Sequence, residues 1–176
     1  MIKVIDLTTP ERRSGGKHFD SLSLAEKESI LERDIKSYVY KVAFYREQFE
    51  NHDELLRGNP GNETIRTHMV QLLEYVAEYG KTLVGLYDML VKIRPADGNI
   101  QEARALAAGA LAEDEKTLWR KLQIAAPLMI EYRRGLIRHG NRLISENPRR
   151  SRFCKKVMRY HVGRIAEYEK SIGQRG

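Results

Sequence analysis

The sequence has little of several residue types that would identify its class. Its single cysteine, Cys154, cannot form an internal disulfide, which excludes the disulfide-rich secreted scaffolds. No apolar run approaches the ~18–20 residues that a transmembrane helix needs. The N-terminus also lacks the apolar segment of a secretory signal. We therefore expect a cytoplasmic protein.

Motifs for catalysis and metal binding are also missing. The chain has no His-Glu-x-x-His motif and no Glu-x-x-His pair, and Gly15-Gly16-Lys17 lacks the upstream spacing of a phosphate-binding loop. We accordingly expect no enzymatic activity, no metal site and no cofactor. His52, His139 and His161 lie on the apolar faces of three predicted helices. The sequence does not decide whether they converge, and local hydrogen bonding is the simpler expectation.

Charge is abundant but unevenly distributed. Residues 1–118 carry 16 Lys and Arg against 20 Asp and Glu, whereas residues 119–176 carry 15 against 4. The net charge is therefore −4 in the first part and +11 in the second, which together give the overall +7. A cationic last third favours contact with an anionic partner, which could be nucleic acid, an acidic protein or an anionic membrane surface.

Apolar residues recur at helical spacing through most of the chain. Steps of four and three predict helices over about residues 23–57, 63–94, 100–146 and 148–172, separated by turns rich in Gly, Pro and Asn. The first seam runs through Leu24, Glu28, Leu31, Ile35, Tyr38, Val42, Tyr45, Phe49, His52 and Leu56. The second runs through Ile65, Met69, Leu72, Val76, Tyr79, Leu83, Leu86, Leu90 and Ile93, and the last through Cys154, Met158, His161, Ile165, Tyr168 and Ile172. The later part of the third runs through Leu122, Ala125, Met129, Tyr132, Leu136, His139 and Leu143. Pro127 predicts a kink or break in this third region, because it removes one backbone hydrogen bond.

The pattern predicts an all-α fold. Short connections favour antiparallel neighbours, so we expect an elongated antiparallel bundle of about four long helices with coiled-coil-like heptad seams. Residues 1–20 are predicted to form a flexible N-terminal arm, and residues 21–176 a single domain that ends in a cationic hairpin over about 128–172. Seams this regular also favour a homo-oligomer.

Two rows of cations carry the functional prediction. On the third helical region the arginines are spaced i, i+4, i+8, and a similar row follows the turn near 145–148. The predicted phosphate ligands are Arg134, Arg138, Arg142, Arg149, Arg152, Lys156 and Arg159. Auxiliary contacts are predicted at Arg120, Lys121, Arg133, Arg150 and Lys155. In an antiparallel hairpin the two rows start together at the turn and can run side by side.

We interpret these rows as a nucleic-acid-binding surface. Arginine suits bidentate phosphate contact, and binding through phosphates is largely independent of base sequence. Aromatic residues are scarce near the rows, and Tyr160 is the main candidate. A platform for stacking single strands is therefore not indicated. The alternative is a protein-binding adaptor or inhibitor whose helical seams and basic face dock an acidic protein.

Overall fold

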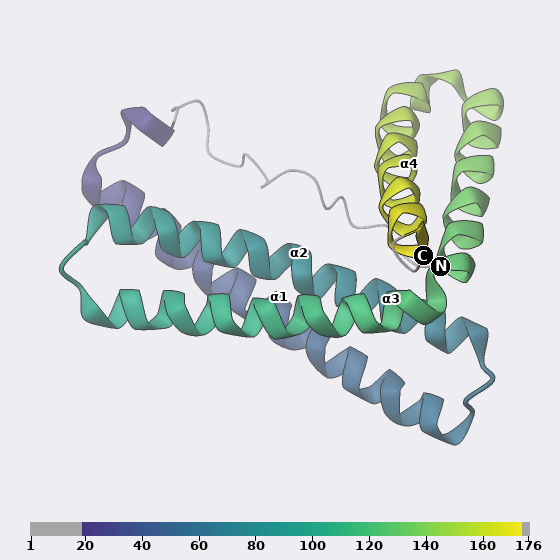
Figure 1. Cartoon of the computed structure of the whole chain (residues 1–176). Helices are drawn as coiled ribbons and strands as arrows, with labels where there is room; N and C mark the ends of the chain where they lie inside the picture. Colours follow the sequence, from purple (N-terminus) through teal and green to yellow (C-terminus); the bar gives the residue numbers. More distant parts are fainter. Residues whose placement is uncertain (1–18, 174–176) are drawn as a thin grey trace.

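The protein is all-α, as the sequence predicts (Figure 1). The computed structural model describes residues 19–173, except for the side chains of Arg150 and Ser171. In chain order the elements are the 3-10 turn η1 (Phe19–Ser21), α1 (Leu24–Gly58), α2 (Glu63–Ile93), α3 (Gly98–Glu146), the 3-10 turn η2 (Pro148–Arg150) and α4 (Ser151–Gly173). The arm predicted over residues 1–20 lies outside the described residues, except that Phe19 and Asp20 belong to η1.

Short polar side chains define where the helices begin. Ser23 caps α1 in a capping box, since its Oγ accepts from the Glu26 amide and Glu26 accepts from the Ser23 amide. Asn62 caps α2 by accepting from the Ile65 amide at 3.0 Å. Asp97 caps α3, and its carboxylate accepts from two amides of the first turn. The predicted boundaries fall close to these residues because Asn62 and Asp97 lie in turns that contain Gly and Pro, and Ser23 is a favoured N-cap residue just before the first apolar seam.

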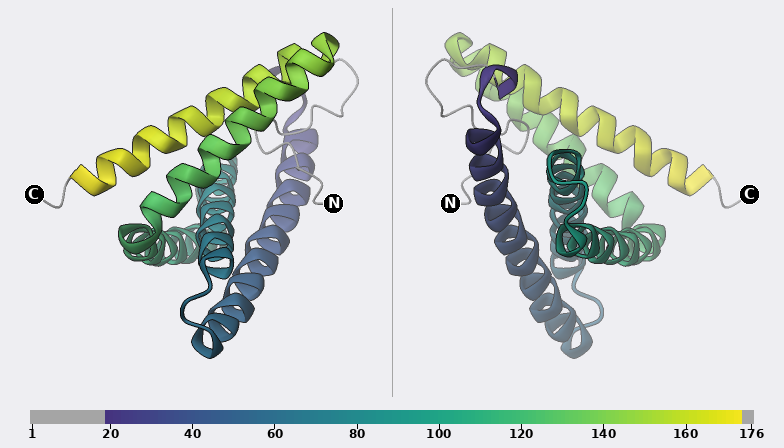
Figure 2. Two further views of the ribbon diagram at one scale, coloured as in Figure 1. Left: turned by 90° about the vertical axis from the view of Figure 1, so that its right-hand side faces the viewer. Right: turned by 90° about the vertical axis from the view of Figure 1, so that its left-hand side faces the viewer.

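The two predicted seams of α1 and α2 face each other. Leu31, Ile35 and Val42 of α1 are buried in one cluster with Val76 and Tyr79 of α2. Tyrosine rings extend this contact, with the Tyr79 centroid 5.7 Å from that of Tyr38 and 5.5 Å from that of Tyr45. The aromatic side chains along the seam are therefore core. The first part of α3 packs on the other side of α2, so α2 lies centrally in a three-helix body formed by α1, α2 and α3 up to Ala126 (Figures 1 and 2).

α3 bends sharply at Pro127 without ending. The helix is continuous from Gly98 to Glu146, and Figure 1 shows it turning out of the three-helix body. Pro127 is exposed, which places the lost backbone hydrogen bond on the solvent side. The predicted kink is confirmed. Its consequence is that α4 packs against α3 beyond the bend as a projecting hairpin.

The buried face of α3 shifts around the helix after this bend. Ala125 and Met129 are buried as predicted, but the seam positions Tyr132 and His139 are exposed. Their neighbour Arg133 is buried instead. The predicted seam is wrong at Tyr132 and His139, whereas Leu136 and Leu143 are half-buried. The stripe that faces α4 lies about one residue further along, through Arg133, Ile137 and Gly140.

α4 closes the hairpin along its own predicted seam. Cys154 and Tyr168 are buried, and Met158 packs over Gly140 of α3 so closely that a Cβ there would lie 2.9 Å from the methionine Cγ. Val70 of α2 belongs to the same cluster as Met129 and Tyr168, so α2 contributes to both cores. The assignment of 21–176 to a single domain stays a prediction.

In the described residues, no helix has the length and apolar character of a membrane span.

Two glycines of the hairpin provide a matched test of its packing. A Cβ at Gly163 would meet nothing within 4 Å, so Gly163→Ala should raise the free energy of unfolding by roughly 0.5–1 kcal/mol through helix propensity. Gly140→Ala should gain less, or lose stability, because Met158 must move. Urea unfolding measures both, and equal gains would contradict the Gly140–Met158 contact.

Candidate cationic interface

The seven predicted phosphate ligands all lie on the projecting hairpin and all are exposed. Arg134, Arg138 and Arg142 follow the bend of α3, and Arg149 lies in η2 at the turn. Arg152, Lys156 and Arg159 lie on α4. Both views in Figure 2 show the turn between α3 and α4 projecting past the three-helix body.

Five of the seven cations lack an ion-pair partner within the described part of the chain. Arg134 pairs with Glu131 at 2.8 Å and reaches Glu169 of α4 at 3.5 Å. Arg142 lies 3.8 Å from Glu146 and 3.0 Å from Nδ1 of His139. The five without such a partner are Arg138, Arg149, Arg152, Lys156 and Arg159. No acidic side chain of the described residues balances the charge of these five.

Acidic residues are nearly absent around these cations. Between Gly135 and Ala166, Glu146 is the single acid in the sequence. At 100° per residue, both rows lie about 100° or more from the stripe of their own helix that packs in the hairpin. The rows therefore occupy outward faces and wrap around the hairpin, and they do not merge into one flat strip. Arg134 reaches across to the other helix through Glu169.

The auxiliary predictions have different outcomes. Arg120 and Lys155 are exposed and remain candidates, whereas the side chain of Arg150 lies outside the described residues. Lys121 donates to Asp53 of α1 at 2.9 Å and is thereby engaged in holding α3 against α1. Arg133 is 4% exposed, so it cannot contact phosphate, and the prediction for this residue is wrong.

Arg133 belongs to a buried charged cluster that we call the Glu74 cluster: Glu74, Arg133, His161, Arg164 and Tyr168. Glu74 is 2% exposed and forms ion pairs with both arginines, through Oε2 to Arg133 and through Oε1 to Arg164 at 2.5 Å. The Tyr168 hydroxyl donates to Glu74 and accepts from Nε of Arg133 at 2.9 Å. One carboxylate from α2 thus holds two guanidinium groups, one from α3 and one from α4.

The geometry assigns the protonation state of His161. Nη1 of Arg133 lies 2.8 Å from Nδ1 of His161, and an arginine can only donate, so Nδ1 accepts and the imidazole is neutral. Burial and the Arg133 charge lower the pKa of His161 to about 4, despite the opposing effect of Glu74. For Arg133, burial lowers the pKa, but Glu74 and Tyr168 raise it by more, so the guanidinium stays charged.

The Glu74 cluster sets the position of the hairpin on the body. Next to it, the Tyr160 hydroxyl donates to Glu78 of α2 at 2.9 Å, so α4 is bonded to α2 at two successive turns. Sequence reasoning missed Glu74 as a core residue. The available signal was its place in the stripe of Val70, Leu73 and Ala77, where an acidic residue implies a buried partner.

The histidines do not converge. His52 lies beside His68, with ring centroids 6.0 Å apart, while His139 is exposed and His161 is in the Glu74 cluster. Among the described residues, no group of three or more His, Cys, Asp or Glu side chains could hold a metal ion.

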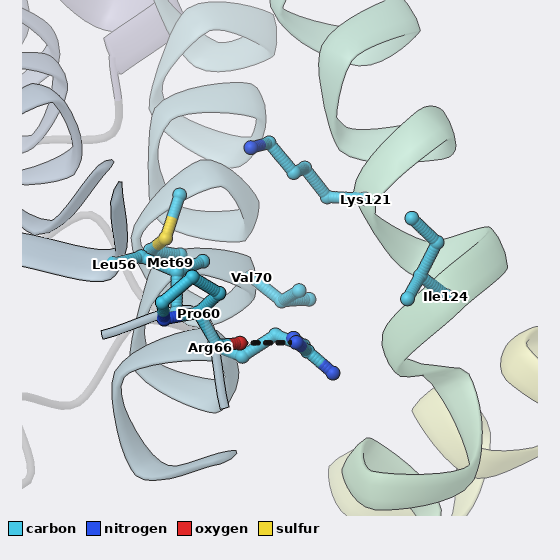
Figure 3. A pocket seen from close by; sticks show the side chains of 7 residues that line it. All are labelled: Leu56, Pro60, Arg66, Met69, Val70, Lys121 and Ile124. Atoms are coloured by element: carbon cyan, nitrogen blue, oxygen red, sulfur yellow. Dashed lines mark hydrogen bonds between the residues drawn. The ribbon is translucent and has the colours of Figure 1, made fainter. Parts of the chain in front are cut away.

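A small cavity of about 200 Å³ lies between the α1–α2 turn and α3 just before the bend (Figure 3). Leu56, Met69 and Ile124 contribute apolar walls. Its two cations are already engaged, since Lys121 pairs with Asp53 and Arg66 donates to the Pro60 carbonyl at 2.7 Å. The cavity therefore provides no free polar group that would orient a ligand.

No protein-family model matches this chain, and no curated protein or solved structure shows significant similarity to it.

Removing the Glu74 carboxylate should weaken the packing of the hairpin on α2. Glu74→Gln leaves Arg133 buried without a counter-charge and Arg164 with only Glu167, and we expect it to lower the free energy of unfolding by about 3–5 kcal/mol. The matched control Glu78→Gln weakens one hydrogen bond to Tyr160 and should cost about 1 kcal/mol. Urea unfolding and the rate of Cys154 labelling by a thiol reagent measure the effect, since Cys154 is buried in the hairpin. Similar losses in the two variants would contradict the central role of Glu74.

Stability should also depend on pH through His161. Its folded pKa of about 4 lies below the unfolded value of 6.5, so the unfolded state binds the proton first. The contribution of the neutral His161 ring to the free energy of unfolding is complete above pH 6.5 and is lost as the pH falls toward 4. Because the ring is only partly buried, we expect a loss of about 1 kcal/mol at pH 5. Unfolding at pH 5 and pH 7 should show a smaller difference for His161→Gln than for the unmodified protein.

Proposed function

We propose that this protein is a non-enzymatic nucleic-acid-binding protein that contacts phosphates through its cationic hairpin, largely independently of sequence. One observation carries the proposal. Arg138, Arg149, Arg152, Lys156 and Arg159 are exposed on outward faces of the hairpin and form no ion pair with the described residues. A surface of this kind is stabilised by an external polyanion that replaces the missing acidic partners.

The spacing of the rows suits a phosphate backbone. Residues four apart on a helix are separated by about 6 Å along its axis, which is close to the distance between successive phosphates of a strand. Six of the seven predicted ligands are arginines, whose planar guanidinium groups bind phosphate oxygens in pairs. Several phosphates can therefore be contacted at once from either helix.

The rest of the molecule favours binding through the hairpin alone. Residues 1–118 carry a net charge of −4, which repels a phosphate backbone and leaves the hairpin as the attractive surface. Tyr160 is half-buried and bonded to Glu78, so it is not free to stack on bases. Contact with phosphates and little contact with bases supports binding that is largely independent of sequence.

An acidic protein partner is the second candidate. Phe153 and Val162 of α4 are 53% and 56% exposed among the cations, and such mixed apolar and basic surfaces are typical of protein interfaces. This alternative places the same hairpin against a folded acidic surface. The two candidates differ in whether free nucleic acid binds.

Charge removal on the hairpin tests the proposal. We expect labelled duplex DNA, single-stranded DNA or RNA to bind with an affinity that falls steeply with salt in fluorescence anisotropy. Changing Arg138, Arg152 and Arg159 to Gln should weaken binding and reduce the slope of log K against log salt by about three for a duplex, or about two for a single strand.

The matched control changes the same number of cations on the three-helix body. Lys81, Lys92 and Lys116 are exposed there, and their replacement by Gln alters the net charge equally. This control should keep the slope of the unmodified protein. Equal losses in both triple variants would indicate non-specific attraction, and no binding of any probe at low salt would reject the nucleic-acid proposal in favour of an acidic protein.

A further inference from the structure

α1 carries a second row of side chains on the face turned away from α2. The row repeats at steps of three and four, like the inner seam, and every member is exposed. We call it the outer row: Arg33, Lys36, Tyr40, Ala43, Glu47, Glu50 and Glu54. A heptad-like pattern on an exposed face is what a helix needs to pack lengthwise on another helix.

The centre of the outer row is apolar. Tyr40 is 72% exposed and stacks on Phe44, which is 43% exposed, with ring centroids 6.4 Å apart. Val39 and Ala43 are exposed beside them. Single exposed apolar residues are normal, but two large aromatic side chains side by side form a patch that association would bury.

The two ends of the row carry opposite charges. Arg33 and Lys36 lie on the N-terminal side of the apolar centre, and Glu47, Glu50 and Glu54 lie on the C-terminal side. Within the described part of the chain, Lys36 and the three glutamates form no ion pair, and Arg33 contacts its neighbour Asp34. By contrast, Arg46, which lies toward the inner side of α1, pairs with Asp114 of α3 at 2.5 Å.

We propose that the outer row binds the outer row of a second copy of this chain, with the two α1 helices antiparallel about a two-fold axis near Ala43. In that arrangement Tyr40 and Phe44 pack against their counterparts at the centre. Lys36 of each copy then lies opposite Glu50 of the other and Arg33 lies beside Glu54, while Glu47 is one turn nearer the centre than Glu50. The charge pattern is thus self-complementary, as a two-fold interface requires.

The pattern also selects the direction of the partner helix. A parallel arrangement places Arg33 and Lys36 opposite themselves and the glutamates opposite glutamates, which is repulsive at both ends. From Arg33 to Glu54 the row extends about 32 Å along the helix axis. The surface lies on α1 and shares no residue with the cationic hairpin, so the two are independent.

The first test is the mass of the full chain without nucleic acid. Sedimentation equilibrium should show a monomer–dimer equilibrium at micromolar concentrations. Tyr40→Glu combined with Phe44→Glu should raise the dimer Kd at least about 30-fold, the factor for loss of a central hot spot. Leu106→Glu, at an equally exposed position on α3, is the control and should leave the dimer unchanged. A monomer at 100 µM, or a dimer that resists the double change, would overturn the proposal.

Charge reversal tests the antiparallel geometry. An acidic variant carries Arg33→Glu and Lys36→Glu, and a basic variant carries Glu47→Lys, Glu50→Lys and Glu54→Lys. Each alone should be monomeric, because both ends of its row then have the same sign. Mixed in equal amounts, the two should form a heterodimer whose Kd rises with salt. Circular dichroism checks that each variant is folded, and failure of the mixture to associate would reject the two-fold arrangement.

Discussion

The position of the hairpin depends on how one buried carboxylate is neutralised. Glu74 is almost fully buried, and its two ion pairs bring arginines from α3 and α4 into the core. A buried ion pair costs much of its attraction in desolvation, so the cluster contributes more to the choice of geometry than to net stability. Because Glu74 already faces two guanidinium groups, a third cation beside Arg133 is disfavoured, and His161 stays neutral. The Glu74 cluster therefore determines which charges of the C-terminal region are internal and which face solvent.

The bend at Pro127 is the second constraint, and it works together with the first. A straight α3 would continue along α2, and α4 would then pack beside it as the fourth helix of a single bundle. With the bend, α3 and α4 separate from the body as a hairpin whose outward faces need no apolar residues. Those faces hold five cations that form no ion pair with the described residues, whereas cations nearer the body, such as Lys121 and Arg133, are bound to acids. The bend of α3 thus separates the cations that form ion pairs in the core from those that are exposed on the hairpin.

Much of this fold could be predicted from the sequence, because its signals are local. Caps such as Ser23 and Asn62 stand next to their helices, and the seams of α1 and α2 keep one phase throughout. Prediction failed for Tyr132, His139 and Arg133, since no local signal gives the direction in which a proline bends a helix. It also missed the Glu74 cluster, whose arginines are 59 and 90 residues away from Glu74 in the chain. The exposed cations were predictable because helical spacing alone places them together.

The hairpin and the outer row of α1 are two surfaces with different charge patterns. The exposed charges of the hairpin rows are mostly positive, so this surface attracts a polyanion and repels the hairpin of a second copy. On α1, opposite charges flank an apolar centre, so the surface is complementary to itself and gains little from a polyanion. Because the surfaces lie on different helices, occupation of one leaves the other open. A dimer through α1 would carry two hairpins, and two linked phosphate-binding surfaces hold a long polyanion more tightly than one, provided that the polyanion can span both. Self-association and phosphate binding would then reinforce each other without sharing a residue.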